Sequence, residues 1–393
     1  MSDLPIYSIL IHYSEIALKL KNRSYFEKIF IDNIKNHITP LIYSKIKLDS
    51  ARVFIHNINY TEWDKYKSRL RNIMGMQHAT LMIKTSCHLK SIKKATDLVI
   101  KDKDFNSFRI TTKRNNKSFR YDSNEINREV GSYVQKLSGA NVNLNFPSLN
   151  IIIEVLKDNA YIGFDRVQGF SGLPARCQEK ALSLISSGID SPVASFEMIK
   201  RGVKLDFIHF HSYPAVNQQS IENVKEILNV LTKYELRTNL YLVPLLDIQQ
   251  KIMEVIPDKF WVIFFRRVMM EIANNIADKI NAVTLVTGDS VGQVASQTLS
   301  NLRAVSDASK LPVLRPLSGM NKENIINKAR EIGTYDISVL PYQDCCSFFV
   351  PKHPETRAKM KDIFFYDNKL DLDSLFKDVY KNIEKIKIVY KGE

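Results

Sequence analysis

The architecture of the second half of the chain follows from the segment Ala181-Leu182-Ser183-Leu184-Ile185-Ser186-Ser187-Gly188-Ile189-Asp190-Ser191-Pro192-Val193-Ala194. Its apolar start predicts a buried strand, the small residues after it end that strand, and Pro192 opens a helix. A strand, a short turn and a helix N-terminus form a phosphate cradle, because turn N–H groups and the positive end of the helix dipole point to one place. The serine hydroxyls add hydrogen-bond donors, and Asp190 offers a carboxylate for a magnesium ion.

This turn is not a Walker loop, because no Gly-Lys-Ser/Thr follows the strand. It resembles instead the pyrophosphate-binding loop, Ser-Gly-Gly-x-Asp-Ser, of enzymes that split ATP into AMP and pyrophosphate. The simpler alternative is an ordinary serine-capped turn between a strand and a helix. Ser187 stands where the pattern has Gly, which would cost free energy if that position required a positive φ or a close phosphate approach.

Length and composition indicate a multidomain globular protein. A chain of 393 residues, 45% hydrophobic and 25% charged, predicts two or three domains with real cores. The longest apolar stretch, residues 260–270, is interrupted by Arg266 and Arg267, and no window reaches the roughly 20 apolar residues of a membrane span. Four cysteines and an N-terminus without a signal-peptide pattern favour a reducing, cytoplasmic setting with no membrane partner.

The charge balance favours a polyanionic partner. Lysine and arginine number 56 against 42 acidic residues, a formal net charge of +14. A lysine-rich proteome with solvated faces would give the same balance, but the basic residues cluster, and Phe119 and Tyr121 lie among the second cluster. Basic residues between aromatics suit an RNA backbone and a stacking platform. The candidate RNA-binding residues are Lys19, Lys21, Arg23, Lys113, Arg114, Lys117 and Arg120.

Hydrophobic periodicity divides the chain into three α/β domains, at residues 1–60, 61–168 and 175–393, with a linker at 170–174. In the third domain strands alternate with helices, which predicts a parallel, doubly wound sheet. The predicted strands are 182–185, 205–210, 240–243 and 283–287, the predicted helices are 193–201, 220–234 and 260–280, and the lysine-rich end, about 367–390, is predicted helical. Ligands of such sheets lie beyond the carboxyl ends of the strands, so residues 186–191, 209–211 and 288–290 should surround one crevice.

Further motifs identify a family. They are Gly288-Asp-Ser-Val-Gly-Gln-Val-Ala-Ser-Gln-Thr298, Asp344-Cys-Cys-Ser-Phe-Phe-Val-Pro-Lys-His-Pro354 and Tyr13-Ser-Glu-Ile-Ala-Leu-Lys19. With the loop, they make the chain resemble the tRNA 4-thiouridine synthases, the ThiI-type sulfurtransferases, over nearly its whole length. The resemblance implies an N-terminal ferredoxin-like α+β domain, an RNA-binding THUMP domain and an ATP-pyrophosphatase (PP-loop) domain. It also implies that ATP activates uridine 8 of tRNA and that sulfur replaces its carbonyl oxygen.

The resemblance implies roles for individual residues. Asp190 would act in catalysis near Mg²⁺, and Cys345 or Cys346 would carry sulfur as a persulfide, while Cys87 and Cys177 are expected to be structural and no iron–sulfur cluster is expected. Asp289 is either a second metal ligand or a helix cap. The residues implied to hold ATP are Leu184, Ile185, Ser186, Ser187, Gly188, Ser191, His209, Phe210, Arg266, Gly288 and Gln297.

Partners and alternatives follow. Because the sequence shows no rhodanese domain after the cysteines, we expect the sulfur to come from a cysteine desulfurase or from sulfide, and we do not carry over the thiamine role of members that have that domain. The resemblance also suggests a homodimer on tRNA. Ser14 and Leu20 also occupy positions where the resemblance leads us to expect Gly. One rival function is another AMP-forming ligase of the same loop class, which would use ammonia. The other is a non-catalytic tRNA-binding protein with a degenerate ATP site, for which Ser187 is the argument.

Overall fold

The structure is a computed structural model that describes residues 5–116, 118–341, 349 and 351–392. The chain forms two compact units, Met1–Pro174 and Ala175–Glu393. They separate at the end of the predicted linker, whereas the predicted boundary at residue 60 falls inside the first unit and stays a prediction. In the described part of the chain no helix is long and apolar enough to cross a membrane.

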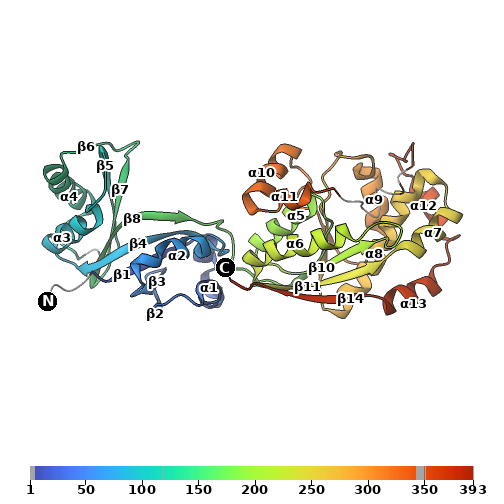
Figure 1. Ribbon diagram of the computed structural model, residues 1–393, viewed down its shortest axis with the longest axis horizontal. Helices are drawn as coiled ribbons and strands as arrows, with labels where there is room; N and C mark the ends of the chain where they lie inside the picture. The colour runs from blue at the N-terminus through green and yellow to red at the C-terminus, as the bar shows by residue number, and fades with distance from the viewer. Residues whose placement is uncertain (1–4, 117, 342–348, 350, 393) are drawn as a thin grey trace. The chain divides into compact units, whose positions relative to one another are not determined.

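An eight-stranded sheet forms the first unit, in the order β2-β3-β1-β4-β8-β7-β5-β6. Its long strand β4 pairs antiparallel with both β1 and β8, so one sheet continues through the regions predicted as ferredoxin-like and THUMP domains. Figure 1 labels these strands. Their bounds are β1 Tyr7–Tyr13, β2 Lys45–Asp49, β3 Arg52–His56, β4 Met76–Ser86, β5 Ser107–Arg114, β6 Asn141–Val142, β7 Leu149–Val155 and β8 Asn159–Gln168.

Four helices pack on one face of this sheet, which we call the helical face. They are α1 Arg23–Ile38, α2 Trp63–Leu70, α3 Leu89–Ile100 and α4 Ser123–Ser138. Alternation along the strands sends Ile151 and Ile153 of β7 into the apolar core under α3 and α4. The residue between them, Ile152, joins a smaller apolar cluster on the opposite face. The two faces of this sheet are therefore chemically distinct.

In the second unit the predicted doubly wound sheet is confirmed. Its order is β13-β12-β9-β10-β11-β14, and all neighbours are parallel except β11 and β14. After β9 the chain adds β10 and β11 on one side of it, and then β12 and β13 on its other side. The direction of winding therefore reverses between β9 and β12. That switch point is where such sheets bind ligands. The bounds are β9 Lys180–Leu184, β10 Lys204–His211, β11 Arg237–Pro244, β12 Thr284–Val286, β13 Val313–Leu314 and β14 Glu384–Val389.

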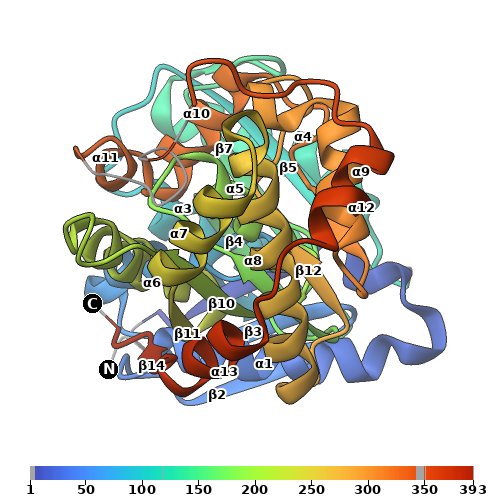
Figure 2. The ribbon, with the colours of Figure 1, turned by 90° about the vertical axis from the view of Figure 1, so that its right-hand side faces the viewer.

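Helices cover both faces of the second sheet. Helices α5 and α6 contact β10, while α8 contacts β9 and β12 and shares an apolar core with Leu182, Ile208 and Val243. Figure 2 shows β10 and β11 between α6 and α8. The helices are α5 Asp190–Lys200, α6 Gln219–Glu235, α7 Leu246–Val255, α8 Trp261–Lys279, α9 Leu299–Asp307, α10 Lys322–Ile332, α11 Tyr335–Ser338, α12 Met360–Asp367 and α13 Asp373–Lys381.

At the C-terminal end the expected continuous helix is wrong. Helix α13 ends at Lys381, and Glu384–Val389 forms the edge strand β14, antiparallel to β11. The reason is visible in the sequence, because Ile386 and Ile388 alternate with lysines at the two-residue period of a strand. Ile388 is buried against the unit, and the lysines give the sheet a charged edge that resists pairing with other chains.

Candidate active site

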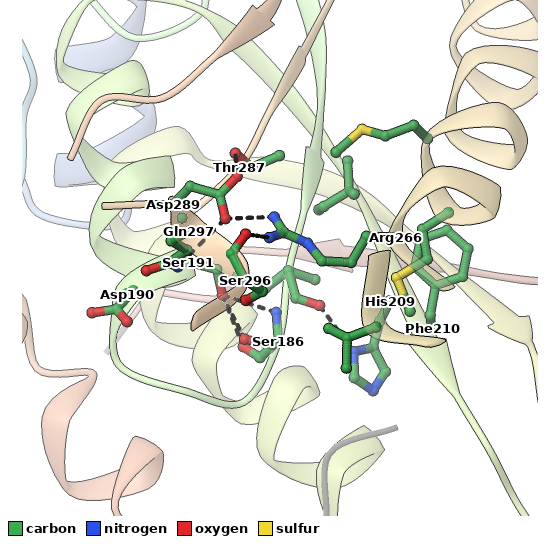
Figure 3. A pocket seen from close by; sticks show the side chains of 16 residues that line it. Ser186, Asp190, Ser191, His209, Phe210, Arg266, Thr287, Asp289, Ser296 and Gln297 are labelled. Carbon is green, nitrogen blue, oxygen red and sulfur yellow. Dashed lines mark hydrogen bonds and ion pairs between the residues drawn. The ribbon is translucent and has the colours of Figure 1, made fainter. Parts of the chain in front are cut away.

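The loop that follows β9 is shaped by its own serines. The Ser191 Oγ accepts a hydrogen bond of 2.8 Å from the backbone N–H of Ser186 and lies 3.1 Å from the Ser186 Oγ. The Ser186 Oγ in turn accepts a hydrogen bond from the Gly188 N–H at 3.4 Å. Figure 3 shows Ser186 and Ser191 together at the start of α5. The hydroxyls predicted to bind phosphate therefore also hold the loop in its curved shape at the positive end of that helix.

Ser187, the departure from the loop pattern, fits its position without backbone strain. It is 1% exposed and is not among the residues of positive φ. Its hydroxyl has no hydrogen-bond partner among the described residues. The backbone argument for a degenerate loop therefore fails, because this conformation does not require glycine.

Gly288, which follows β12, is needed for a reason that the sequence did not reveal. A Cβ atom there would lie 2.7 Å from the backbone nitrogen of Ser191 and 2.8 Å from its Cα. The close approach is thus between two backbones, the end of β12 and the start of α5, rather than between backbone and nucleotide alone. Any side chain at 288 would push the phosphate cradle out of position.

A buried carboxylate organises the wall of the site. Asp289 is 5% exposed, and its two oxygens lie 2.5 Å from the Arg266 guanidinium and 3.2 Å from that of Arg315. Thr287 donates to it at 2.8 Å and Gln297 at 3.4 Å. Burial alone would raise its pKa, but the guanidiniums and the Thr287 hydroxyl outweigh burial and lower it.

Both expectations for Asp289 are therefore corrected. Its oxygens are occupied by donors, so it is not placed as a metal ligand, and the described helix that comes next begins only at Ala295. It orients Arg266, whose guanidinium also reaches the Ser296 carbonyl at 3.4 Å (Figure 3). Arg266 is thus an anchored arginine at the site and not a free surface residue.

Asp190 begins α5 and is already in contact with two groups. Its oxygens accept from Lys322 at 2.7 Å and from Gln293 at 3.0 Å. Lys322 begins α10, 132 residues later, and no sequence signal pointed to it. Among the described residues no three acidic, histidine or cysteine side chains converge on a metal site. One carboxylate fits Mg²⁺ only if phosphate oxygens supply further ligands.

A cavity of about 250 Å³ opens beside the loop. Ten predicted residues line it: Leu184, Ile185, Ser186, Asp190, Ser191, His209, Phe210, Arg266, Gly288 and Gln297. The predicted Ser187 and Gly188 are not among its lining residues. Six lining residues were missed: Val262, Met269, Met270, Thr287, Asp289 and Ser296. Helical spacing from Arg266 could have found three of them, since Val262, Met269 and Met270 lie at i−4, i+3 and i+4.

His209 links two neighbouring strand ends across the cavity wall. Its Nδ1 lies 2.9 Å from the carbonyl oxygen of Ile185. A carbonyl only accepts, so the proton is on Nδ1 in this arrangement. The bond fixes the orientation of the His209 ring in the cavity wall.

The first basic cluster lies at the start of α1 and is partly tied down. Arg23 contacts the Tyr13 hydroxyl and Glu27, the latter at 2.7 Å, and Lys19 lies over the Phe26 ring at 5.1 Å. Lys21 is exposed. Of the three predicted RNA-binding residues, Lys21 therefore carries the least constrained charge.

The second basic cluster is mixed. Arg114 donates to the carbonyls of Phe119 and Tyr121, at 3.0 and 3.2 Å, and so holds the loop. Both rings are half-buried and pack against the core under α3 and α4, and their role as a stacking platform stays a prediction. Lys113 and Arg120 are exposed, and Lys117 lies outside the described residues.

The candidate sulfur carriers Cys345 and Cys346 also lie outside the described residues. The chain before them is anchored to the loop of the site, and the chain after them is anchored to α9. Ser338 donates to the carbonyl of Gly188 at 3.4 Å, and Asn301 donates to that of Glu355 at 2.7 Å. Cys87 donates to the Leu156 carbonyl, burial raises the pKa of its thiol, and Cys177 is buried, which agrees with structural roles.

Comparisons with known proteins agree with this geometry. Residues 8–80 match the ThiI ferredoxin-like domain, 88–165 the THUMP domain, and 176–372 the family described as thiamine biosynthesis protein (ThiI). Two relatives named "Probable tRNA sulfurtransferase" come from Thermoanaerobacter pseudethanolicus and Acetivibrio thermocellus. The first is 37% identical over 96% of this chain and 99% of its own, the second 38% over 97% and 98%.

Solved structures extend the comparison. A structure described as a 4-thiouridine synthetase–RNA complex with bound ATP is 34% identical, with a TM-score of 0.87 over 98% of this chain and all of its own. The structure of PH1313 from Pyrococcus horikoshii, at 20% identity and a TM-score of 0.63, covers 83% of this chain and 99% of its own and shows the fold alone.

Proposed function

We propose that this chain, which belongs to the ThiI family of tRNA sulfurtransferases, uses ATP to form 4-thiouridine at position 8 of tRNA, with release of AMP and pyrophosphate. The carrying observation is the cavity at the sheet's switch point, where the cradle of Ser186 and Ser191 faces the anchored guanidinium of Arg266. A polar loop and a fixed cation that line one cavity suit a nucleoside triphosphate.

The reaction divides into two steps. The uracil O4 attacks the α-phosphorus of ATP, an O–P bond forms, and the bond to pyrophosphate breaks. Hydrosulfide, or the terminal sulfur of a cysteine persulfide, then forms a bond to C4, and the C–O bond to AMP breaks. With a persulfide donor, a second thiol must cleave the S–S bond and become oxidised in turn, so a thiol reductant completes the cycle.

This chain's residues supply the electrostatics. N–H groups of the loop and the end of α5 would hold the leaving pyrophosphate, and Arg266 would offset charge that develops on the phosphates. Mg²⁺, when bound with ATP, would supply further charge neutralisation beside Asp190. Lys322, whose ammonium lies 2.7 Å from an Asp190 oxygen, would hold that carboxylate in place.

Sulfur supply and assembly are parts of the same proposal. Cys346, or its neighbour Cys345, would carry the persulfide, and a cysteine desulfurase or inorganic sulfide would provide the sulfur. A homodimer could hold one tRNA through the RNA-binding region of one subunit and the catalytic unit of the other. The rival ammonia-using ligases have no need for an RNA-binding THUMP region, which this chain matches over residues 88–165.

The test is to incubate the protein with unmodified tRNA, Mg-ATP and sulfide, and to measure the near-ultraviolet absorbance of 4-thiouridine. Asp190→Ala should abolish the product, whereas Asp278→Ala, at an exposed position of α8, should not change it. With a desulfurase and cysteine as the donor, Cys345→Ser and Cys346→Ser should differ and so identify the carrier. A folded wild-type protein that binds tRNA but yields no product would instead support the non-catalytic alternative.

A further inference from the structure

A cluster of charged and imidazole side chains lies on the face of the first unit's sheet opposite the helical face. Strand register places its members side by side: His12 is opposite His78, Thr80 is opposite Arg166, and Lys113 is beside Glu154. The small apolar cluster that includes Ile152 occupies the same face. We call this set the inner-face cluster; it consists of His12, Arg52, His78, Lys113, Glu154 and Arg166.

The sheet curls so strongly that distant strands meet across this face. Strands β3 and β7 are four places apart in the sheet order, which would be about 19 Å in a flat sheet. Yet Arg52 of β3 lies 2.6 Å from Glu154 of β7, and His12 lies 2.7 Å from the same carboxylate. Glu154 is 1% exposed, so one buried carboxylate joins the two sides of the curled sheet.

The inner-face cluster has more cations than it can pair. Glu154 is its only carboxylate, and Arg52 and His12 already occupy it. Arg166 is half-buried, and burial lowers the pKa of its guanidinium although Glu154 acts in the opposite direction. Its one hydrogen bond goes to the Thr80 hydroxyl at 3.4 Å, and among the described residues it forms no ion pair. A guanidinium that has lost water and gained only one long hydrogen bond to a neutral hydroxyl destabilises the fold.

His78 adds a second unsatisfied group. It is 6% exposed, and its ring stacks on that of His12 with centroids 4.5 Å apart. Its Nε2 has no hydrogen-bond partner within the described part of the chain. Burial, together with the nearby charges of Arg166 and Lys113, lowers the pKa of His78 to about 3, so the ring is neutral at physiological pH. A neutral imidazole nitrogen beside two free cations is a polar group that a bound anion and its hydration could satisfy.

We propose that Arg166 and Lys113 of the inner-face cluster bind a phosphate group of the RNA backbone, a contact that rests on the proposed tRNA substrate. The planar guanidinium matches two phosphate oxygens and the exposed Lys113 ammonium adds a second charge. The Glu154 ion pairs hold the curled sheet, on whose inner face the charges of Arg166 and Lys113 both act on His78. Phosphate binding would offset the free-energy cost of holding Arg166 half-buried without an ion pair to any described residue.

The test compares Arg166→Gln with Lys94→Gln, a matched loss of charge at an exposed position of α3, in the full-length protein. Binding of unmodified tRNA is measured between about 50 and 200 mM salt. Arg166→Gln should weaken binding roughly three- to tenfold and reduce the slope of log Kd against log salt by about one, whereas Lys94→Gln should leave both unchanged. Arg166→Lys should retain most of the slope.

Stability separates a binding role from a structural one. Because Arg166 has no ion pair, Arg166→Gln should leave the thermal midpoint unchanged or raise it. Wild-type tRNA affinity and slope in Arg166→Gln, or an equal loss in Lys94→Gln, would overturn the proposal while thiolation by the wild type stands. A wild type that binds tRNA with the predicted Arg166 dependence but makes no 4-thiouridine would overturn the proposed function alone.

Discussion

Two buried carboxylates that contact arginines, Asp289 in the catalytic unit and Glu154 in the first unit, differ in how completely their networks are paired. In the catalytic unit, Asp289 meets two guanidiniums and two neutral donors, and its four contacts fill both oxygens. In the first unit, Glu154 meets Arg52 and His12 while Arg166 is left without an ion pair among the described residues. The fully paired Asp289 network holds Arg266 in one position before substrate binds, and a catalytic cavity needs such a preorganised group. A network with surplus charge instead leaves a cation available for a ligand such as the RNA phosphate proposed above.

The largest expected effect is at Asp289. Asp289→Asn leaves Arg266 and Arg315 facing each other in a buried place, which should cost about 3–5 kcal/mol of unfolding free energy and weaken ATP binding, because Arg266 loses its anchor. Urea unfolding and ATP titration measure the two effects. Asp278→Asn, on the exposed face of α8, is the matched control. Equal stability and ATP affinity in both variants would show that the Asp289 network does not organise the site.

A smaller loss is expected at Glu154. Glu154→Gln should cost about 3 kcal/mol, at the lower end for a broken buried pair, because Arg52 retains bonds to the Ser50 carbonyl and to Asn115. Adding Arg166→Gln should recover part of this loss, since it removes a cation that Glu154 no longer offsets. A double-mutant cycle in urea measures that coupling. Purely additive losses would mean that Glu154 and Arg166 do not interact energetically. The Glu154 network would then have no surplus cation to distinguish it from the Asp289 network.

The pH dependence of the first unit tests its buried imidazole. The folded-state pKa of His78 is lowered to about 3 from an ordinary value of 6.5, so below pH 6.5 the unfolded chain binds a proton that the folded chain does not. Above pH 6.5 His78 is neutral in both states and adds no pH dependence. Below pH 6.5 its proton uptake on unfolding lowers the free energy of unfolding by about 1.4 kcal/mol per pH unit, down to about pH 3. His78→Gln should remove this part of the slope in unfolding experiments at several pH values. An unchanged slope in His78→Gln would show that other groups take up the protons on unfolding.

Much of the candidate site could be predicted because it depends on local pattern. The strand after Lys180 and the helix at Asp190 follow from short-range periodicity, and the rule for carboxyl ends of parallel strands brought Ser186, His209 and Gly288 to one edge. Lys322 and Arg315 could not be found in this way. Each reaches an aspartate through a contact between distant parts of the chain, 132 residues apart for Lys322 and 26 for Arg315, and no periodicity encodes such a contact.

The first unit shows the same limit more strongly. The sequence grouped Lys113 with its neighbours Arg114 and Arg120, whereas register places it beside Glu154 and across the curled sheet from Arg52. Curling depends on the twist summed over many strands, and a local window does not contain it. The prediction of a basic surface was therefore a statement about composition. Which cations are paired and which remain available emerged only from the three-dimensional arrangement.

The smallest expected effect separates two of the three positions where the family resemblance led us to expect glycine. Ser187 in the catalytic unit has no positive φ, but Leu20 in the first unit has a φ of 40° and is 83% exposed. Leu20→Gly should stabilise the first unit by up to about 1 kcal/mol, since glycine adopts this conformation without steric cost and Leu20 buries little surface that would be lost. Ser187→Gly should not stabilise the catalytic unit, because it only adds freedom to the unfolded chain. Thermal unfolding of the two variants decides between these cases, and a stabilised Ser187→Gly would mean that the loop does carry backbone strain.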